Sequence, residues 1–116
     1  MTSEPSTVPD IDVDEANRLV AGGALLLDVR EDDEWEAGHA GEAVHVAMGL
    51  IADQVDRIPS DRTVVCVCRV GGRSAAVAGA LAGAGYDVRN LDGGMLAWES
   101  AGLPVVTTDG QSGRVI

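Results

Sequence analysis

The chain of 116 residues contains no lysine and no phenylalanine, and aromatic residues make up only 3% of it. All eight basic side chains are arginines, against 19 acidic ones, so the formal net charge is −11 at pH 7. Proteins that bind nucleic acids cluster lysine and arginine to neutralise phosphates, and an anionic membrane surface repels an acidic chain. The composition therefore argues against nucleic acid and anionic membranes as partners.

Long apolar runs and cysteine are also scarce. No segment approaches the length of a membrane span, and residues 1–10 lack the basic start and apolar stretch of a secretory signal. The two cysteines, Cys66 and Cys68, are one residue apart, a spacing that is unfavourable for a disulfide on a strand. Two cysteines and two distant histidines do not make a four-ligand zinc site. We therefore expect a reduced, cytoplasmic protein without a metal.

Apolar and small residues, by contrast, are plentiful. Hydrophobic residues make up 46% of the chain, which also has 15 glycines. At this length one domain is expected, with a core filled mainly by valine, leucine, isoleucine and alanine. We expect residues 1–10 to form a flexible N-terminal arm, residues 11–106 the domain, and residues 107–116 a polar C-terminal tail.

Strand and helix patterns alternate along this domain. Short apolar or β-branched runs predict strands at 24–29, 43–46, 63–67 and 87–91. Helical spacing, capping residues and glycine or proline stops predict helices at 12–21, 32–37, 49–58, 75–84 and 95–100. Because the connections are too long for hairpins, this order predicts an α/β fold with a largely parallel central sheet.

One loop has the features of a reactive site. The strongest predicted strand, 63–67, leads into it, a helix follows it, and it consists of Cys68, Arg69, Val70, Gly71, Gly72 and Arg73. Ligands of parallel sheets bind beyond the carboxyl ends of the strands, and the N–H groups at a helix start favour negative charge. Such a position lowers the pKa of a cysteine, and the two arginines favour a thiolate and an anionic substrate. The pattern therefore predicts that Cys68 is a nucleophile.

This loop resembles the active-site loop of rhodanese-like sulfurtransferases, which reads Cys-Arg-x-Gly-x-Arg-Ser in many single-domain members. Two further segments are similar to signatures of that family: residues 27–39, with Leu-Asp-Val-Arg-Glu and Glu-Trp-Glu-Ala-Gly-His, and residues 91–104, with Leu-Asp-Gly-Gly and Ala-Trp. The matches span about residues 12–106 in the family's order. Residues 40–47 depart from the family's usual continuation, which leaves the path of that segment open.

The resemblance implies a three-layer domain with helices on both faces of the sheet, and a sulfurtransferase that needs no cofactor or metal. In such an enzyme Cys68 attacks the outer sulfur of a small anionic donor such as thiosulfate. Residues 69–73 hold the resulting persulfide, and a thiol, cyanide or a protein thiol accepts the sulfur. Asp28 and Arg30 are expected to support the site through a structural ion-pair network.

Two other functions are weighed against this one. One is a non-catalytic sulfur-carrying or interaction module for a partner protein. The other is a phosphatase or arsenate reductase, because the related fold of those enzymes also uses a cysteine loop. That fold places five residues between its cysteine and its arginine, whereas Cys68 and Arg73 enclose four, and the tighter loop favours a single sulfur over a phosphate.

Other conspicuous residues have simpler structural interpretations. Cys66 lies inside an apolar strand and is expected to be a core thiol, the alternative being a resolving partner for Cys68. Arg69 at the loop rim and Arg73 at the helix start face either the substrate or, alternatively, solvent and structural partners. Structural or packing roles are also expected for His39, His45, Trp35 and Trp98, and a solvated helix start for residues 31–34.

Overall fold

The computed structural model describes residues 8–116, so most of the predicted N-terminal arm lies outside the described residues. One sheet of five strands has the order β1-β5-β4-β2-β3, and each neighbouring pair is parallel. The predicted α/β fold with a parallel sheet is confirmed. The strands and α-helices are β1 (Asp10–Ile11), α1 (Val13–Ala21), β2 (Leu25–Asp28), α2 (Asp32–Ala37), β3 (Val44–His45), β4 (Val64–Val67), α3 (Gly72–Gly83), β5 (Val88–Leu91) and α4 (Gly94–Ser100).

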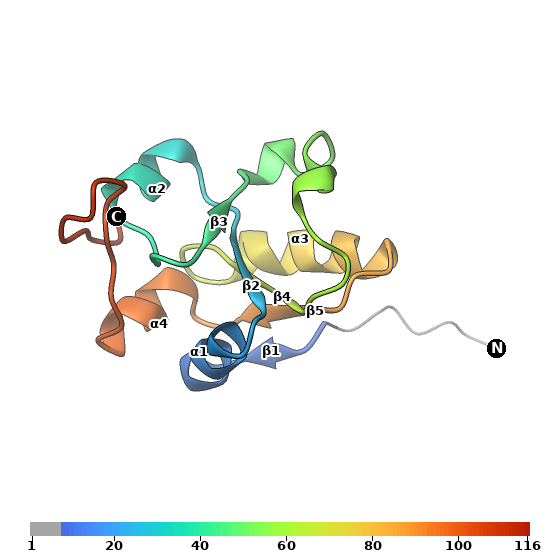
Figure 1. Ribbon diagram of the computed structural model, residues 1–116, viewed down its shortest axis with the longest axis horizontal. Helices are drawn as coiled ribbons and strands as arrows, with labels where there is room; N and C mark the ends of the chain where they lie inside the picture. The colour runs from blue at the N-terminus through green and yellow to red at the C-terminus, as the bar shows by residue number, and fades with distance from the viewer. Residues whose placement is uncertain (1–7) are drawn as a thin grey trace.

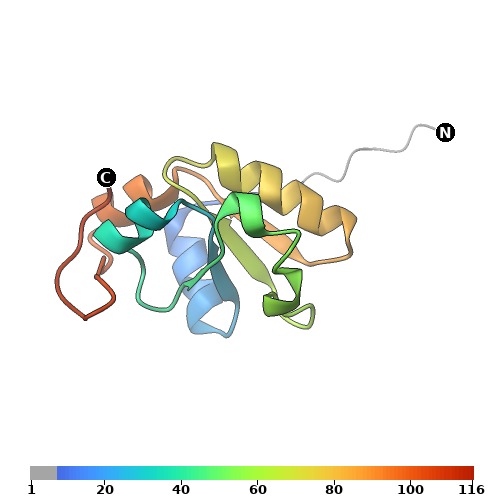
Figure 2. The same ribbon diagram turned by 90° about the horizontal axis from the view of Figure 1, so that it is seen from above.

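Each face of the sheet has its own apolar core. In β4, Cys66 packs in the cluster that includes the buried face of α3, whereas Val65 and Val67 pack in the cluster that includes α1 and α4. This division follows from the alternation of side chains along a strand. Figures 1 and 2 show α3 on one side of the strands and α1 with α4 on the other, which confirms the three layers implied by the resemblance.

Local signals placed most elements within a few residues of their observed bounds. Asp12 is the N-cap of α1, and its side chain accepts a hydrogen bond from the N–H of Glu15 at 2.9 Å. The bounds of α2 are as predicted, whereas α3 begins three residues before the predicted start at Ala75. The open segment 40–47 contains β3, which pairs with β2 at Leu27 and Asp28.

The prediction of a helix over residues 49–58 is wrong. The segment forms two separate 3₁₀ turns, η1 (Met48–Leu50) and η2 (Val55–Arg57). The sheet holds one end, because the N–H of Met48 donates to Val29 O at 2.9 Å. At the other end the hydroxyl of Tyr86 donates to Ile58 O at 3.0 Å, so that carbonyl is bound by a side chain rather than by a helix. Tertiary contacts thus replace the regular pattern that the apolar spacing suggested.

Segments at both ends of the described chain join the domain. The short strand β1, which was not predicted, pairs with β5, and Asp92 N–H donates to Ile11 O at 2.9 Å. Near the other end, Val106 pairs with His39 through two backbone hydrogen bonds of 2.8 and 2.9 Å. Figure 1 shows this final segment in red beside α2. Within residues 8–116, no helix has both the length and the apolar character needed to cross a membrane.

Candidate active site

The loop of residues 68–73 runs from the end of β4 into the first turn of α3. Only 1% of Cys68 is exposed, and the N–H of Gly71 donates to its Sγ at 3.1 Å. Gly71 is the N-cap of α3 and has φ +119°, in a left-handed region that glycine adopts without strain. The turn at Gly71 therefore directs its N–H group at the sulfur.

The hydrogen bonds around Cys68 favour its ionised form. Burial by itself raises the pKa of the thiol, but hydrogen bonds from the Ser74 hydroxyl and from the backbone N–H groups of Ser74, Gly71 and Val70 outweigh it. The net effect lowers the pKa of Cys68 below its usual value. For Cys66, burial raises the pKa to about 12, so that thiol stays protonated within the core. The environments of the two thiols therefore shift their pKa values in opposite directions.

Both loop arginines have partners within the described chain. Arg73 forms a two-pronged ion pair with Glu34 of α2, at 2.7 and 2.9 Å between nitrogen and oxygen. The Nε of Arg69 donates to the carbonyl of Ile116 at 3.0 Å. The sequence analysis predicted neither partner, since Glu34 is 39 residues from Arg73 and Ile116 is 47 residues from Arg69.

Glu34 and Arg73 stay charged over a wide pH range. The hydrogen bonds from Arg73 lower the pKa of Glu34 to about 2, and those same contacts raise the pKa of the Arg73 guanidinium further above its already high value. The thiolate of Cys68 also contributes to that rise, which places the charge of Arg73 within electrostatic range of the sulfur. The pair ties α2 to the start of α3 beside the loop.

A polar network under the thiol was missed from the sequence. Ser74 Oγ lies 3.3 Å from Cys68 Sγ and 2.6 Å from Asn90 Oδ1, and Asn90 in turn binds Asp10. Ser74 belongs to the quoted loop motif, and Asn90 is an uncharged polar residue within the predicted strand 87–91, which is the signal that could have identified it. Both side chains are buried.

The first turn of α4 supports the loop from below. The N–H of Met95 donates to Cys68 O at 2.8 Å, and the N–H of Leu96 donates to Arg69 O at 3.1 Å. Gly94 has φ +59°, and a Cβ at this position would lie 2.4 Å from the carbonyl oxygens of both Cys68 and Arg69. The glycine pair in the C-terminal signature therefore permits α4 to approach the backbone of the loop.

Asp28 and Arg30 form a fully buried ion pair at the end of β2. Arg30 Nη2 lies 2.8 Å from Asp28 Oδ2 and also donates to Gly38 O at 2.8 Å. The pair thus links the end of β2 to the end of α2, which carries Glu34. A supporting role of both residues for the loop stays a prediction.

The aromatic and histidine side chains make structural contacts. His39 stacks on Trp35 with ring centres 3.5 Å apart, and His45 stacks on the same indole at 4.8 Å. Trp98 is 2% exposed and donates from Nε1 to Pro104 O at 2.9 Å. These residues hold α2, β3 and the final segment together and do not contact Cys68.

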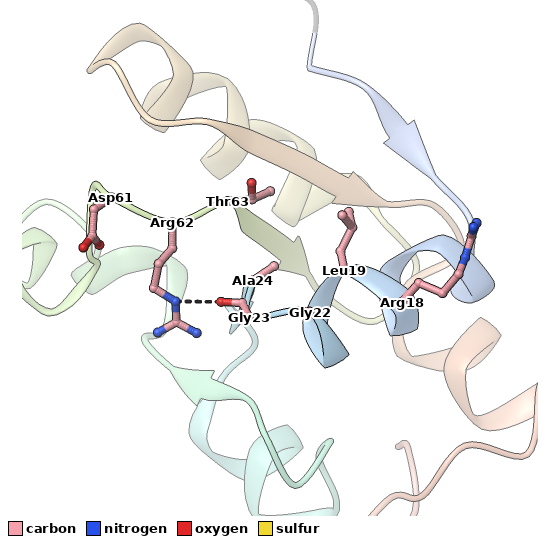
Figure 3. A pocket seen from close by; sticks show the side chains of 8 residues that line it. All are labelled: Arg18, Leu19, Gly22, Gly23, Ala24, Asp61, Arg62 and Thr63. Atoms are coloured by element: carbon pink, nitrogen blue, oxygen red, sulfur yellow. Dashed lines mark hydrogen bonds between the residues drawn. The ribbon is translucent and has the colours of Figure 1, made fainter.

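A separate pocket lies at the amino ends of β2 and β4, whereas the loop with Cys68 follows the carboxyl end of β4. It measures about 380 Å³ and is lined by the end of α1 and by the residues that precede β2 and β4. Figure 3 shows Arg62 donating from Nε to Gly23 O across it, at 2.8 Å. The cysteines lie in and after β4, so this pocket is remote from the reactive loop.

Comparisons with known proteins agree with the motifs. Residues 12–101 match the family model described as a rhodanese-like domain. A sulfurtransferase of Allochromatium vinosum is 38% identical, over 89% of this chain and 99% of its own. The thiosulfate sulfurtransferase GlpE of Pseudomonas syringae is 35% identical, over 84% and 92%. The crystal structure of a rhodanese-related protein from Thermoplasma volcanium superposes with a TM-score of 0.79 at 24% identity, over 84% and 97%.

Proposed function

The chain belongs to the family of rhodanese-like domains, and on this basis we propose that it is a thiosulfate sulfurtransferase that works through a persulfide of Cys68. One observation carries the proposal: a single thiol of lowered pKa receives N–H hydrogen bonds where β4 passes into α3. Thiosulfate as the donor is supported by the similarity to GlpE, whose name specifies that substrate.

In the first step the thiolate of Cys68 attacks the outer sulfur of thiosulfate. A bond forms between Sγ and that sulfur, the sulfur–sulfur bond of thiosulfate breaks, and sulfite leaves with the bonding electrons. The negative charge of the persulfide then lies on its outer sulfur, where the N–H groups of residues 69–73 and the dipole of α3 stabilise it. Arg69 and Arg73 add positive charge at the rim of the loop.

In the second step an acceptor nucleophile removes the outer sulfur. The acceptor forms a bond to that sulfur, the bond to Sγ breaks, and the thiolate of Cys68 is restored. Cyanide and thiols are suitable acceptors, and a protein thiol is consistent with the acidic surface, which disfavours small anions. In each step the nucleophile supplies the new bonding pair and the leaving group keeps the old one, so the transfer of the sulfur atom needs no external electron carrier. The two free thiols of the chain suit a reducing compartment, and we assign the reaction to the cytoplasm.

Mass spectrometry of the intact protein tests the proposal. Incubation with thiosulfate is expected to add the mass of one sulfur atom, to release one equivalent of sulfite, and to be reversed by dithiothreitol. The variant Cys68→Ser is expected to gain nothing, and Cys66→Ser serves as the matched control that still gains one sulfur. No mass gain in the wild-type protein would refute thiosulfate as the donor.

Turnover distinguishes the enzyme from a sulfur-carrying module. An enzyme converts excess thiosulfate and cyanide to thiocyanate over many cycles, whereas a carrier module forms the persulfide once and delivers it only to a partner protein. Hydrolysis of an aryl phosphate that depended on Cys68 would instead support the phosphatase alternative.

A further inference from the structure

A chain of polar side chains runs from the thiol of Cys68 to the edge of the sheet. Ser74 in α3 contacts Asn90 in β5, and Asn90 contacts Asp10 in β1. Ser74 has no exposed surface and Asn90 is 4% exposed, so water does not substitute for the contact between them, whereas Asp10 lies at the exposed edge of the sheet. The strand register brings these polar side chains together, because Asn90 pairs with Asp10 of β1 on one side and with Cys66 of β4 on the other.

The amide of Asn90 is held in one orientation. Its Nδ2 donates to Asp10 Oδ1 at 3.0 Å and to Gly71 O at 3.2 Å, and both of these oxygens can only accept. Oδ1 therefore faces Ser74 as an acceptor, at 2.6 Å from Oγ. The same hydroxyl lies 3.3 Å from Cys68 Sγ.

Ser74 has one hydroxyl proton and three acceptors within reach, because Gly71 O also lies 3.3 Å from its Oγ. While the sulfur is an uncharged thiol, the closer carbonyl-type oxygen of Asn90 is the better acceptor. A thiolate carries a full charge and is a stronger acceptor, so the hydroxyl turns toward it. This turn is a rotation about one bond and requires no movement of the backbone.

We propose that Asn90 is a positioning residue. Its Oδ1 accepts the hydrogen bond of the Ser74 hydroxyl while Sγ is uncharged, and the hydroxyl turns to donate to Sγ when Cys68 is a thiolate. In the persulfide, which is the part of this inference that rests on the proposed function, the charge is on the outer sulfur. Sγ is then uncharged, and the Ser74 hydroxyl again donates its hydrogen bond to Asn90 Oδ1. Asn90 thus competes with the thiolate and favours the thiol and the loaded persulfide.

This competition gives a prediction of unusual sign. Removal of the Asn90 carbonyl group frees the Ser74 proton for the sulfur, so the thiolate becomes more favourable, although a hydrogen bond near the site is lost. We expect Asn90→Leu, which keeps the number and branching of the heavy side-chain atoms, to shift the pH profile of Cys68 alkylation to lower pH. At a fixed pH below the pKa, alkylation is expected to become faster, by up to about tenfold.

A double-mutant cycle tests the mechanism. Iodoacetamide alkylation is followed against pH in the wild-type protein, Asn90→Leu, Ser74→Ala and the double variant, with the modified cysteine identified by mass spectrometry. We expect Asn90→Leu to shift the profile in the wild-type background and to have no effect in the Ser74→Ala background. An equal shift in both backgrounds, or a shift to higher pH, would overturn the proposal, because the contact with Gly71 would then account for the effect.

Two measurements keep the test decisive. Asn90→Ala is carried in parallel, and only variants with the wild-type circular dichroism spectrum are compared. Since alkylation requires no sulfur donor, this arm is independent of the proposed function. In a second arm, the persulfide formed with thiosulfate is expected to pass its outer sulfur to added cyanide, with release of thiocyanate and the Cys68 thiolate, faster in Asn90→Leu than in the wild-type protein. An equal or slower transfer would refute the role in the persulfide.

Discussion

At the scale of single residues, the buried pair of Asp28 and Arg30 is the most sensitive contact outside the loop. Neither side chain has exposed surface, and removal of one partner leaves an uncompensated buried charge. We expect Asp28→Ala to lower the free energy of unfolding by about 3–5 kcal/mol, measured by urea denaturation. Asp87→Ala is the control, because its pair with Arg89 is exposed and is worth at most about 1 kcal/mol. Equal effects of the two variants would contradict this interpretation.

The Glu34–Arg73 pair gives a pH dependence at the same scale. The pKa of Glu34 is about 2 in the folded protein, against 4.5 for a glutamate side chain without partners, so the folded state favours the carboxylate. The stability contributed by the carboxylate is fully present above pH 4.5 and is lost as the pH falls toward 2. We expect the difference in unfolding free energy between the wild-type protein and Glu34→Gln to be constant near neutral pH and to decrease across this window. A difference that does not vary with pH would exclude the pair as its source.

At the scale of elements, the site depends on how closely α4 approaches the loop after β4. Two N–H groups of the first turn of α4 donate to the carbonyl oxygens of Cys68 and Arg69. These hydrogen bonds fix the backbone of the residue that carries the thiol. The loop is therefore held from two sides, by the start of α3 and by the start of α4. The acidic helix α2 adds a third support through Glu34.

Gly94→Ala tests this approach. Its Cβ would overlap two backbone oxygens at 2.4 Å, and the backbone at φ +59° adds strain, so we expect a loss of at least about 2 kcal/mol in unfolding free energy. Persulfide formation on Cys68 is expected to fall as well, because the loop must move. Gly79→Ala in α3, where nothing lies within 4 Å of the added Cβ, is expected to stabilise the protein by about 0.5–1 kcal/mol. Thermal unfolding of both variants provides the comparison.

At the scale of the whole molecule, charge is distributed unevenly along the chain. Residues 1–61 hold 15 acidic and 3 basic side chains, whereas residues 62–116, which include the reactive loop, hold 4 acidic and 5 basic ones. A dianion such as thiosulfate is repelled at long range by the first half and attracted only close to the loop. Recognition of the donor therefore depends on short-range contacts.

Added salt should screen, and so weaken, the repulsion between the acidic half of the chain and thiosulfate. We expect the second-order rate constant for loading of Cys68 by thiosulfate to increase between about 10 and 150 mM sodium chloride, because the screening length falls from roughly 30 to 8 Å. Alkylation by iodoacetamide, which is uncharged, is the control and should change little. A rate constant for thiosulfate that falls with salt would mean that the arginines of the loop dominate the field at all distances.

Local sequence was sufficient for much of the fold and for the loop that carries Cys68. β2 and β4 are recognisable because each is a short, mainly apolar run with polar or glycine boundaries, and the cap at Asp12 depends on residues three positions apart. The loop after β4 is equally local, because one continuous segment supplies the cysteine, the N–H groups and the glycine that turns them. Chain neighbours determine such features, so they can be read without knowing the tertiary structure.

Only the tertiary structure determined how the site is supported. Whether residues 49–58 form a helix depended on contacts with Val29 and Tyr86, which lie in other parts of the chain. Arg73 pairs with Glu34, 39 residues away, and Asn90 pairs with Asp10, 80 residues away. The strand order β1-β5-β4-β2-β3 places these distant segments beside one another. The sequence by itself therefore determined the strand, the loop and the helix start that place Cys68, from which we infer its chemistry. The packing of the sheet decided which side chains tune it, because hydrogen bonds and ion pairs depend on distances in space.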